Sequence, residues 1–137
     1  MAVGVLVVAH SRLGHHFVET VIDLIGPLPL ATEILEVRRV QATDALLREG
    51  GRMIDRLDSG SGVLLLTDAY GSTPSNIATH LGNPSRARVV AGVNLPMLLR
   101  VYNYPDLDLP ALAQCAIEGG QRGITLCPSV TNNEAKG

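Results

Sequence analysis

Aromatic side chains are scarce in this chain, and two common signature motifs are missing from it. The 137 residues include no Trp, three Tyr and one Phe, so side chains on which a base could stack are poorly supplied. Neither a GxGxxG fingerprint nor a GxxxxGK[ST] loop occurs, and these are the phosphate-binding motifs of dinucleotide and nucleoside triphosphate sites. These absences disfavour a flavodoxin-like mononucleotide binder and a P-loop nucleotide site.

Charge and apolar residues are not concentrated in any long run either. The chain has 11 Lys and Arg against 13 Asp and Glu, with no basic stripe, so nucleic acid is not an expected partner. No apolar run approaches the roughly 20 residues that cross a bilayer, and no charged leader follows Met1. We therefore expect a cytoplasmic protein without direct membrane insertion. Cys115 and Cys127 form no CxxC pair and are expected to be buried, reduced thiols.

The sequence does contain apolar runs that alternate with helical patterns. Residues 4–9, 63–66 and 89–93 are continuous apolar runs, which are typical of strands covered on both faces. Residues 30–37 form a weaker strand nearer an edge, and 123–126 a short last strand. Helices are expected within residues 12–25 (capped by Ser11), 41–57 (weakened by Gly50 and Gly51), 75–81, 94–99 and 109–118. This order predicts an α/β fold with an open, doubly wound, mainly parallel sheet. Residues 1–130 form one domain and 131–137 a flexible tail.

His10 stands where the first apolar run ends, and Asp68 follows the second run closely. Carboxyl ends of parallel strands share one edge of a sheet, so Gly71, Ser72 and Thr73 should lie at that edge with them. A neutral imidazole can act as a nucleophile, and a carboxylate on one ring nitrogen would fix its tautomer. Small residues before a helix can present N–H groups to a phosphate. The pattern indicates a candidate active site.

Each of these features alone has a structural explanation. His10 could cap the strand end, Asp68 could cap its own turn, and residues 71–74 could be an ordinary connection to a helix. Their occurrence together favours the active site. His15 and His16 point in different directions on a helix and have no suitably spaced partner, so no metal site is expected.

Three segments, residues 9–11, 66–76 and 91–98, resemble the mannose-family enzyme IIA component of the bacterial phosphoenolpyruvate-dependent sugar phosphotransferase system. The resemblance covers residues 1 to about 128 and implies that His10 accepts a phosphoryl group from the phosphocarrier protein HPr and passes it to a IIB-type partner. It also implies that Asp68 contacts the histidine and that the loop from Gly71 through Thr73 lines the phosphate site, without a cofactor. Members of the family form homodimers, in some of which the last strand is exchanged, so residues 124–126 can pair with a neighbouring subunit.

Other readings stay open beside this resemblance. Many family members continue into a IIB domain, but none is expected here, so the acceptor is expected on a separate chain. The start from His10 to Gly14 is also similar to the phosphotransfer subunit of dihydroxyacetone kinase, and a non-catalytic regulatory binding module would keep the same fold. Arg12 either steers an anionic partner or is a surface charge. Residues 95–98 belong either to the core or to a contact surface.

Overall fold

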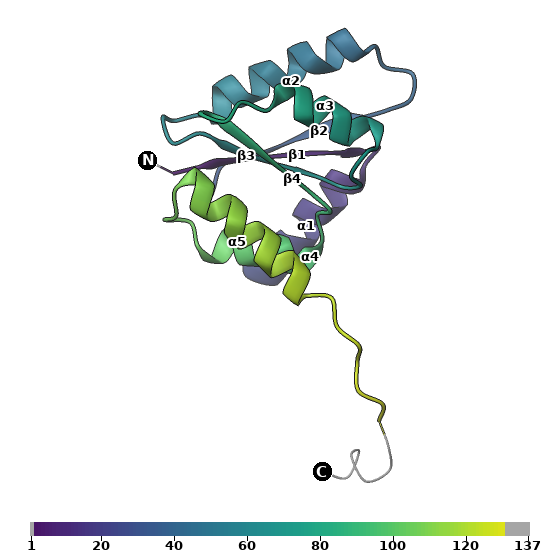
Figure 1. Ribbon diagram of the computed structural model, residues 1–137, viewed down its shortest axis with the longest axis vertical. Coiled ribbons are helices and arrows are strands. Elements are labelled where there is room, and N and C mark those ends of the chain that lie inside the picture. Colours follow the sequence, from purple (N-terminus) through teal and green to yellow (C-terminus); the bar gives the residue numbers. More distant parts are fainter. Residues whose placement is uncertain (1, 131–137) are drawn as a thin grey trace.

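A four-stranded parallel sheet lies between two layers of helices in the computed structural model, which describes residues 2–130 (Figure 1). The strands stand in the order β2-β1-β3-β4, and all neighbours are parallel. The strands are β1 (Gly4–His10), β2 (Thr32–Val37), β3 (Val63–Thr67) and β4 (Ala87–Ala91). The helices in the described residues are α1 (Leu13–Ile25), α2 (Thr43–Leu57), α3 (Thr73–Leu81), α4 (Leu95–Asn103) and α5 (Leu109–Arg122). This is the open, doubly wound sheet that the sequence predicts, with β2 at an edge.

Side chains of β1 alternate between two hydrophobic cores. Leu6 and Val8 pack in the core beneath α2 and α3, whereas Val5 and Val7 pack in the core beneath α1, α4 and α5. All four side chains are fully buried, which explains why this strand shows no polar alternation in the sequence. The same alternation places His10, at the end of β1, on the face that α2 and α3 cover.

Helix α2 runs without a break through Gly50 and Gly51, although the sequence predicts that these two glycines weaken it. Gly50 is buried, and a Cβ added there would lie 2.5 Å from Leu81 Cδ1 of α3. A Cβ added at Gly51 would meet nothing within 4 Å. Gly50 therefore allows α2 and α3 to approach closely, and Gly51 has no such role.

The start of α4 follows its sequence signals. Asn94 caps the helix, because its Oδ1 accepts a hydrogen bond from the backbone N–H of Met97 at 2.9 Å. Met97 and Leu98 are buried in the core with α1 and α5. Of the two readings left open for residues 95–98, the structure therefore supports the core.

The segment after α5 differs from the expectation. Residues 124–130 form no strand in this chain; they are exposed and lead away from α5 (Figure 1). A strand needs a neighbour for its backbone hydrogen bonds, and this segment extends away from α5 instead of pairing with an edge strand of the sheet. Cys127 is consequently exposed, not buried as expected, while Cys115 is half-buried; both are free thiols. Residues 131–137, for which a flexible tail is expected, lie outside the described residues.

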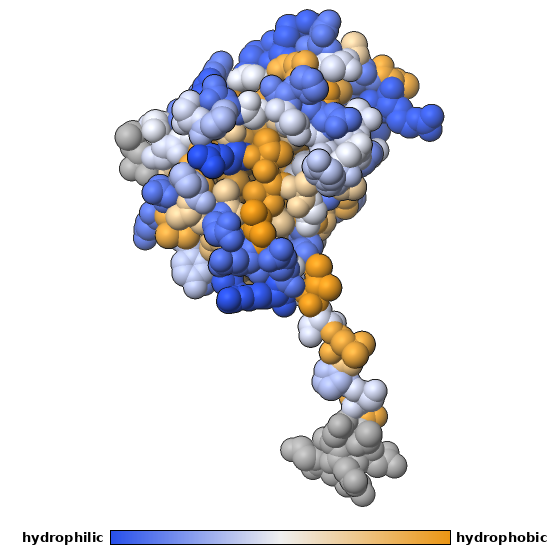
Figure 2. All heavy atoms as spheres, viewed as in Figure 1, coloured by the Kyte–Doolittle hydropathy of each residue, from blue (hydrophilic) through white to orange (hydrophobic). Residues whose placement is uncertain are grey.

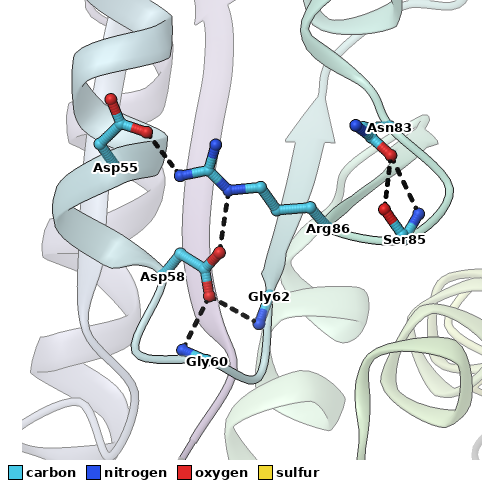
Figure 3. Close-up of polar contacts among 7 residues, drawn as sticks. All are labelled: Asp55, Asp58, Gly60, Gly62, Asn83, Ser85 and Arg86. Atoms are coloured by element: carbon cyan, nitrogen blue, oxygen red, sulfur yellow. Dashed lines mark hydrogen bonds and ion pairs between the residues drawn. The ribbon is translucent and has the colours of Figure 1, made fainter.

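An arginine-centred network fastens the amino end of the sheet, opposite His10. Figure 3 shows Arg86 between Asp55 and Asp58. Its Nε donates to Asp58 Oδ2 at 2.8 Å. Asp58 Oδ1 also accepts hydrogen bonds from the N–H groups of Gly60 and Gly62, at 2.9 and 3.0 Å. The Gly60 N–H, the Arg86 guanidinium and the Gly62 N–H hold the pKa of Asp58 below its usual value. The network joins the end of α2 to the start of β4.

None of the helices among residues 2–130 has the length and apolar character needed to span a membrane.

Candidate active site

His10 and Asp68 are in direct contact at the carboxyl edge of the sheet. The backbone N–H of His10 donates to Asp68 Oδ2 at 2.9 Å, and the same oxygen lies 2.7 Å from His10 Nδ1. The two residues come from the ends of neighbouring strands, β1 and β3. The His10 side chain is 53% exposed and the Asp68 side chain 10% exposed, so a protected carboxylate holds an accessible ring.

The surroundings of Asp68 stabilise its ionised form. Burial raises the pKa of this carboxyl group, but the backbone N–H of His10, the His10 ring and the Ala69 N–H lower it, and the net shift is downward. An ionised carboxylate only accepts hydrogen bonds, so Nδ1 of His10 must carry a hydrogen toward it. In the neutral ring, Nε2 then holds the lone pair and is the available nucleophile.

Backbone hydrogen bonds also hold the main chain of Asp68 in place. The N–H of Gly92, directly after β4, donates to the carbonyl oxygens of Thr67 and Asp68 at 3.0 and 2.9 Å. Gly92 has φ of 90°, a left-handed conformation that glycine adopts without steric cost. The end of β4 therefore fixes the end of β3 from which Asp68 projects.

Ser11 follows His10 in a left-handed conformation, with φ of 46°. Its backbone N–H donates to the carbonyl of Val37 in β2 at 3.0 Å, which keeps the chain against the sheet while it turns toward α1. The expectation that Ser11 caps α1 is wrong: Arg12 occupies the N-cap position, and no side chain caps this helix. A non-glycine residue here costs about 1–2 kcal/mol, and such conformations cluster at functional sites.

Only one of the three residues expected in the phosphate loop lines the cavity beside His10. Thr73, the first residue of α3, borders that cavity. The N–H of Gly71 points to Ser75 Oγ at 3.3 Å, and Ser72 Oγ donates to the carbonyl of Ala69 at 2.5 Å. Gly71 and Ser72 therefore shape the turn between β3 and α3.

A cavity of about 460 Å³ opens beside His10, between the end of β2 and the first turns of α2 and α3. Its lining residues are His10, Ser11, Val37, Arg38, Arg39, Gln41, Thr43, Leu46 and Thr73. No residue between 38 and 43 is among the site residues predicted from the sequence. A signal was present, because these polar residues follow a strand just as His10 and Asp68 do.

The remaining histidines lie apart from this cavity. His16 Nδ1 is 3.9 Å from Glu19 Oε2, and His80 Nδ1 is 2.7 Å from the carbonyl of Asn76. Nδ1 of His15 is buried and has no hydrogen-bond partner among the described residues. Across residues 2–130, no three His, Cys, Asp or Glu side chains are grouped so that they could hold a metal ion. Arg12 is exposed and does not line the cavity.

A parallel α/β sheet with a carboxylate-oriented histidine at its carboxyl edge is the arrangement that the resemblance implies for a mannose-type IIA component. The sequence model of the family EIIA-man, described as "PTS system fructose IIA component", matches residues 4–111, and the chain belongs to this family. Among characterised relatives, the mannose-specific EIIAB component of the phosphotransferase system of Escherichia coli K12 is 28% identical over 127 residues. The match covers 90% of this chain but 39% of that relative.

Solved structures of similar proteins show the same fold. The mannose/sorbose-specific IIA subunit from Enterococcus faecalis superposes with a TM-score of 0.82 at 24% identity, covering 96% of this chain and 100% of that one. The IIA protein associated with the fucose utilization operon of Streptococcus pneumoniae has a TM-score of 0.77 at 22% identity, covering 92% and 96%. The comparisons confirm the resemblance and the fold class.

Proposed function

We propose that this chain is a cytoplasmic phosphoryl carrier that receives a phosphoryl group on His10 from phospho-HPr. It then passes the group to a IIB-type acceptor on a separate chain, in sugar uptake or its regulation. The observation that carries the proposal is the 2.7 Å contact between His10 Nδ1 and Asp68 Oδ2, because it leaves Nε2 as the attacking atom. The exposure of the ring supports a donor that is itself a protein, since a docking surface must reach it.

The proposed step moves one phosphoryl group between two imidazole rings. The lone pair of His10 Nε2 attacks the phosphorus of the donor phosphohistidine, forming a new N–P bond while the donor N–P bond breaks. The bonding electron pair returns to the donor ring nitrogen. No net proton transfer is needed, because Nδ1 of His10 keeps its hydrogen, and the ring becomes positively charged. Asp68 then stabilises that charge, as the acid of a triad stabilises an imidazolium.

Thr73 is the proposed contact for the phosphoryl oxygens from the side of α3. Its hydroxyl and the first N–H groups of α3 are hydrogen-bond donors, and the helix dipole favours negative charge at this end of the helix. Gly71 and Ser72 support the site indirectly, by shaping the turn from which α3 begins. Catalysis on this proposal is positioning and charge stabilisation, and it requires no cofactor.

We further propose a homodimer in which residues 124–126 pair with the open edge of β4 in the partner. In the described chain, β4 pairs with β3 alone among the strands. Figure 2 shows apolar side chains in a band over the region of β4 and α5, and again along the segment after α5. Exposed apolar surface of this kind marks interaction sites.

Labelling with phosphoenolpyruvate, enzyme I and HPr tests the proposed carrier function. We expect the wild type to acquire an acid-labile, base-stable phosphate and the His10→Ala variant to acquire none. His16→Ala removes another exposed histidine, in α1, and should be labelled like the wild type. An unlabelled wild type in the presence of its cognate HPr would favour the non-catalytic binding module, and a labelled His10→Ala would place the phosphate elsewhere.

A further inference from the structure

Two adjacent arginines enter the cavity beside His10 from the end of β2. His10 pairs in register with Val37, the last residue of β2, so the next two residues leave the sheet directly beside the histidine. These residues are Arg38 and Arg39, and both line the same cavity as His10. The sheet topology therefore places both arginines at the cavity that the proposed nucleophile lines.

Arg38 is already engaged by its neighbours. Its Nε and NH2 groups lie 3.2 and 3.0 Å from the two carboxylate oxygens of Glu36, a bidentate ion pair. Its backbone N–H donates to Gln41 Oε1 at 2.6 Å. Glu36 thus neutralises much of the Arg38 charge, and Gln41 fixes the backbone of the loop.

Arg39 has no ion pair with any residue between 2 and 130, unlike Arg38, Arg52, Arg56 and Arg86. It is exposed and borders a cavity to which the described part of the chain contributes no carboxylate. Besides His10 and Arg38, the polar groups there are the hydroxyls of Ser11, Thr43 and Thr73 and the amide of Gln41. The whole chain has a net charge of -2, so the positive charge of this cavity is a local feature. Beside a nucleophile, such a cavity favours the binding of an anion.

The first turn of α2 adds to this preference for negative charge. Thr43 begins this helix of 15 residues; no side chain accepts a hydrogen bond from its N-terminal N–H groups, and the carboxylate of its first turn, Asp44, does not line the cavity. Uncapped N–H groups and the helix dipole favour an anion at this position. Thr43 and Thr73, at the starts of α2 and α3, line the same cavity.

We infer that Arg39 binds the phosphoryl oxygens of the group carried on His10, and that the cavity is an oxyanion site shared by β2, α2 and α3. This inference rests on the proposed function and adds a residue to it. A guanidinium presents parallel N–H donors that match phosphoryl oxygens in a bidentate way. Arg39 would thereby hold the phosphoryl group opposite Asp68, which holds the ring.

Binding of inorganic phosphate tests this inference without any phosphoryl transfer. Titration of the wild type with phosphate should shift the NMR signals of the His10 ring, and Arg39→Gln should weaken this binding about tenfold or more, as expected for the loss of a charged hydrogen-bond donor. Arg48→Gln removes one charge from an exposed position on α2 and should bind within about twofold of the wild type.

Three outcomes of the titration would overturn the inference. These are an Arg39→Gln variant that binds phosphate as Arg48→Gln does, a wild type that binds no phosphate, and full restoration by Arg39→Lys. The last outcome would mean that charge alone suffices, without the guanidinium contact. Thermal unfolding of each variant checks that the fold is intact.

The labelling reaction separates this inference from the proposed function. If the wild type is labelled, Arg39→Gln should slow labelling about tenfold relative to Arg48→Gln, and equal rates would overturn the inference. If the wild type is not labelled while its phosphate binding depends on Arg39, the carrier function fails and the oxyanion site stands.

Discussion

At the scale of single residues, the site depends on two side chains, His10 and Asp68, that differ in their exposure to solvent. The His10 ring is 53% exposed, whereas the Asp68 side chain that holds it is 10% exposed. A carrier needs this inequality, because the group that exchanges phosphate must reach two partners in turn and the group that orients it must stay fixed. A charged hydrogen bond shielded from water is also stronger than an exposed one.

Asp68→Asn should keep the fold but slow phosphoryl transfer to His10. The amide removes the negative charge that stabilises the positively charged phosphohistidine ring, and loss of one charged hydrogen bond corresponds to roughly 10- to 100-fold in rate. Rapid-quench measurement of labelled protein gives the rate, and nitrogen NMR of the ring shows whether Nδ1 still carries the hydrogen. Asp106→Asn, at an exposed position in a loop, is the control. An unchanged transfer rate would remove Asp68 from the mechanism.

The site residues could be predicted from the sequence where they follow a clear strand pattern. His10 and Asp68 each follow an apolar run, so the rule that polar residues at strand ends form sites identifies both. The same rule reaches Arg39, but β2 has a mixed sequence and gives a weak strand signal. The left-handed conformation of Ser11 was not predictable, because it follows from how β1, β2 and α1 meet in space.

At the scale of elements, glycines in helices have opposite roles that the sequence cannot distinguish. Gly51 in α2 and Gly119 in α5 both lie inside helices of the structure. A Cβ added at Gly51 would meet nothing within 4 Å, whereas one at Gly119 would lie 2.5 Å from Arg100 Cβ in α4. The first glycine only weakens its helix, and the second lets two helices pack closely.

Alanine at these two positions should therefore change stability in opposite directions. Gly51→Ala should raise the free energy of unfolding by about 1 kcal/mol, the difference in helix propensity. Gly119→Ala gains the same propensity but must displace α4, and overpacking of about 1–3 kcal/mol should leave it less stable than the wild type. Urea unfolding of both variants measures the difference. A stabilised Gly119→Ala would contradict the close contact between α4 and α5.

The elements themselves were largely predictable, and their ends were less so. Continuous apolar runs identified β1 and β3 because both strands are buried on both faces. The helix predicted over residues 109–118 continues to Arg122 in the structure. The prediction stopped too early because the last turn contains two glycines, which pack against α4 and are poor helix formers. The expected strand at 123–126 needs a partner that this single chain does not provide.

At the scale of the whole molecule, the two ends of the sheet are built differently. The amino end is closed by the network of Arg86 with Asp55 and Asp58. The carboxyl end is open, with the His10 cavity between the end of β2 and the starts of α2 and α3. A closed end and an open end suit the proposed carrier, which would meet different proteins at one edge.

The segment after α5, residues 124–130, is exposed and joins neither the sheet nor a helix of its own chain. Ile124, Leu126 and Val130 are 77%, 95% and 81% exposed, although such side chains are usually buried. Covering each in an interface would contribute about 1.5–3 kcal/mol. We therefore expect the wild type to be a dimer in solution, with this segment between the subunits.

Leu126→Asp should weaken that dimer at least tenfold, because a carboxylate would replace an apolar side chain in the interface and lose its hydration there. Val40→Asp introduces the same charge at a position that is 92% exposed but lies in the loop between β2 and α2, and it should leave the dimer intact. Size-exclusion chromatography with light scattering over a range of concentrations gives the masses. A monomeric wild type, or a Leu126→Asp variant that dimerises as well as Val40→Asp, would mean that residues 124–130 do not join the subunits.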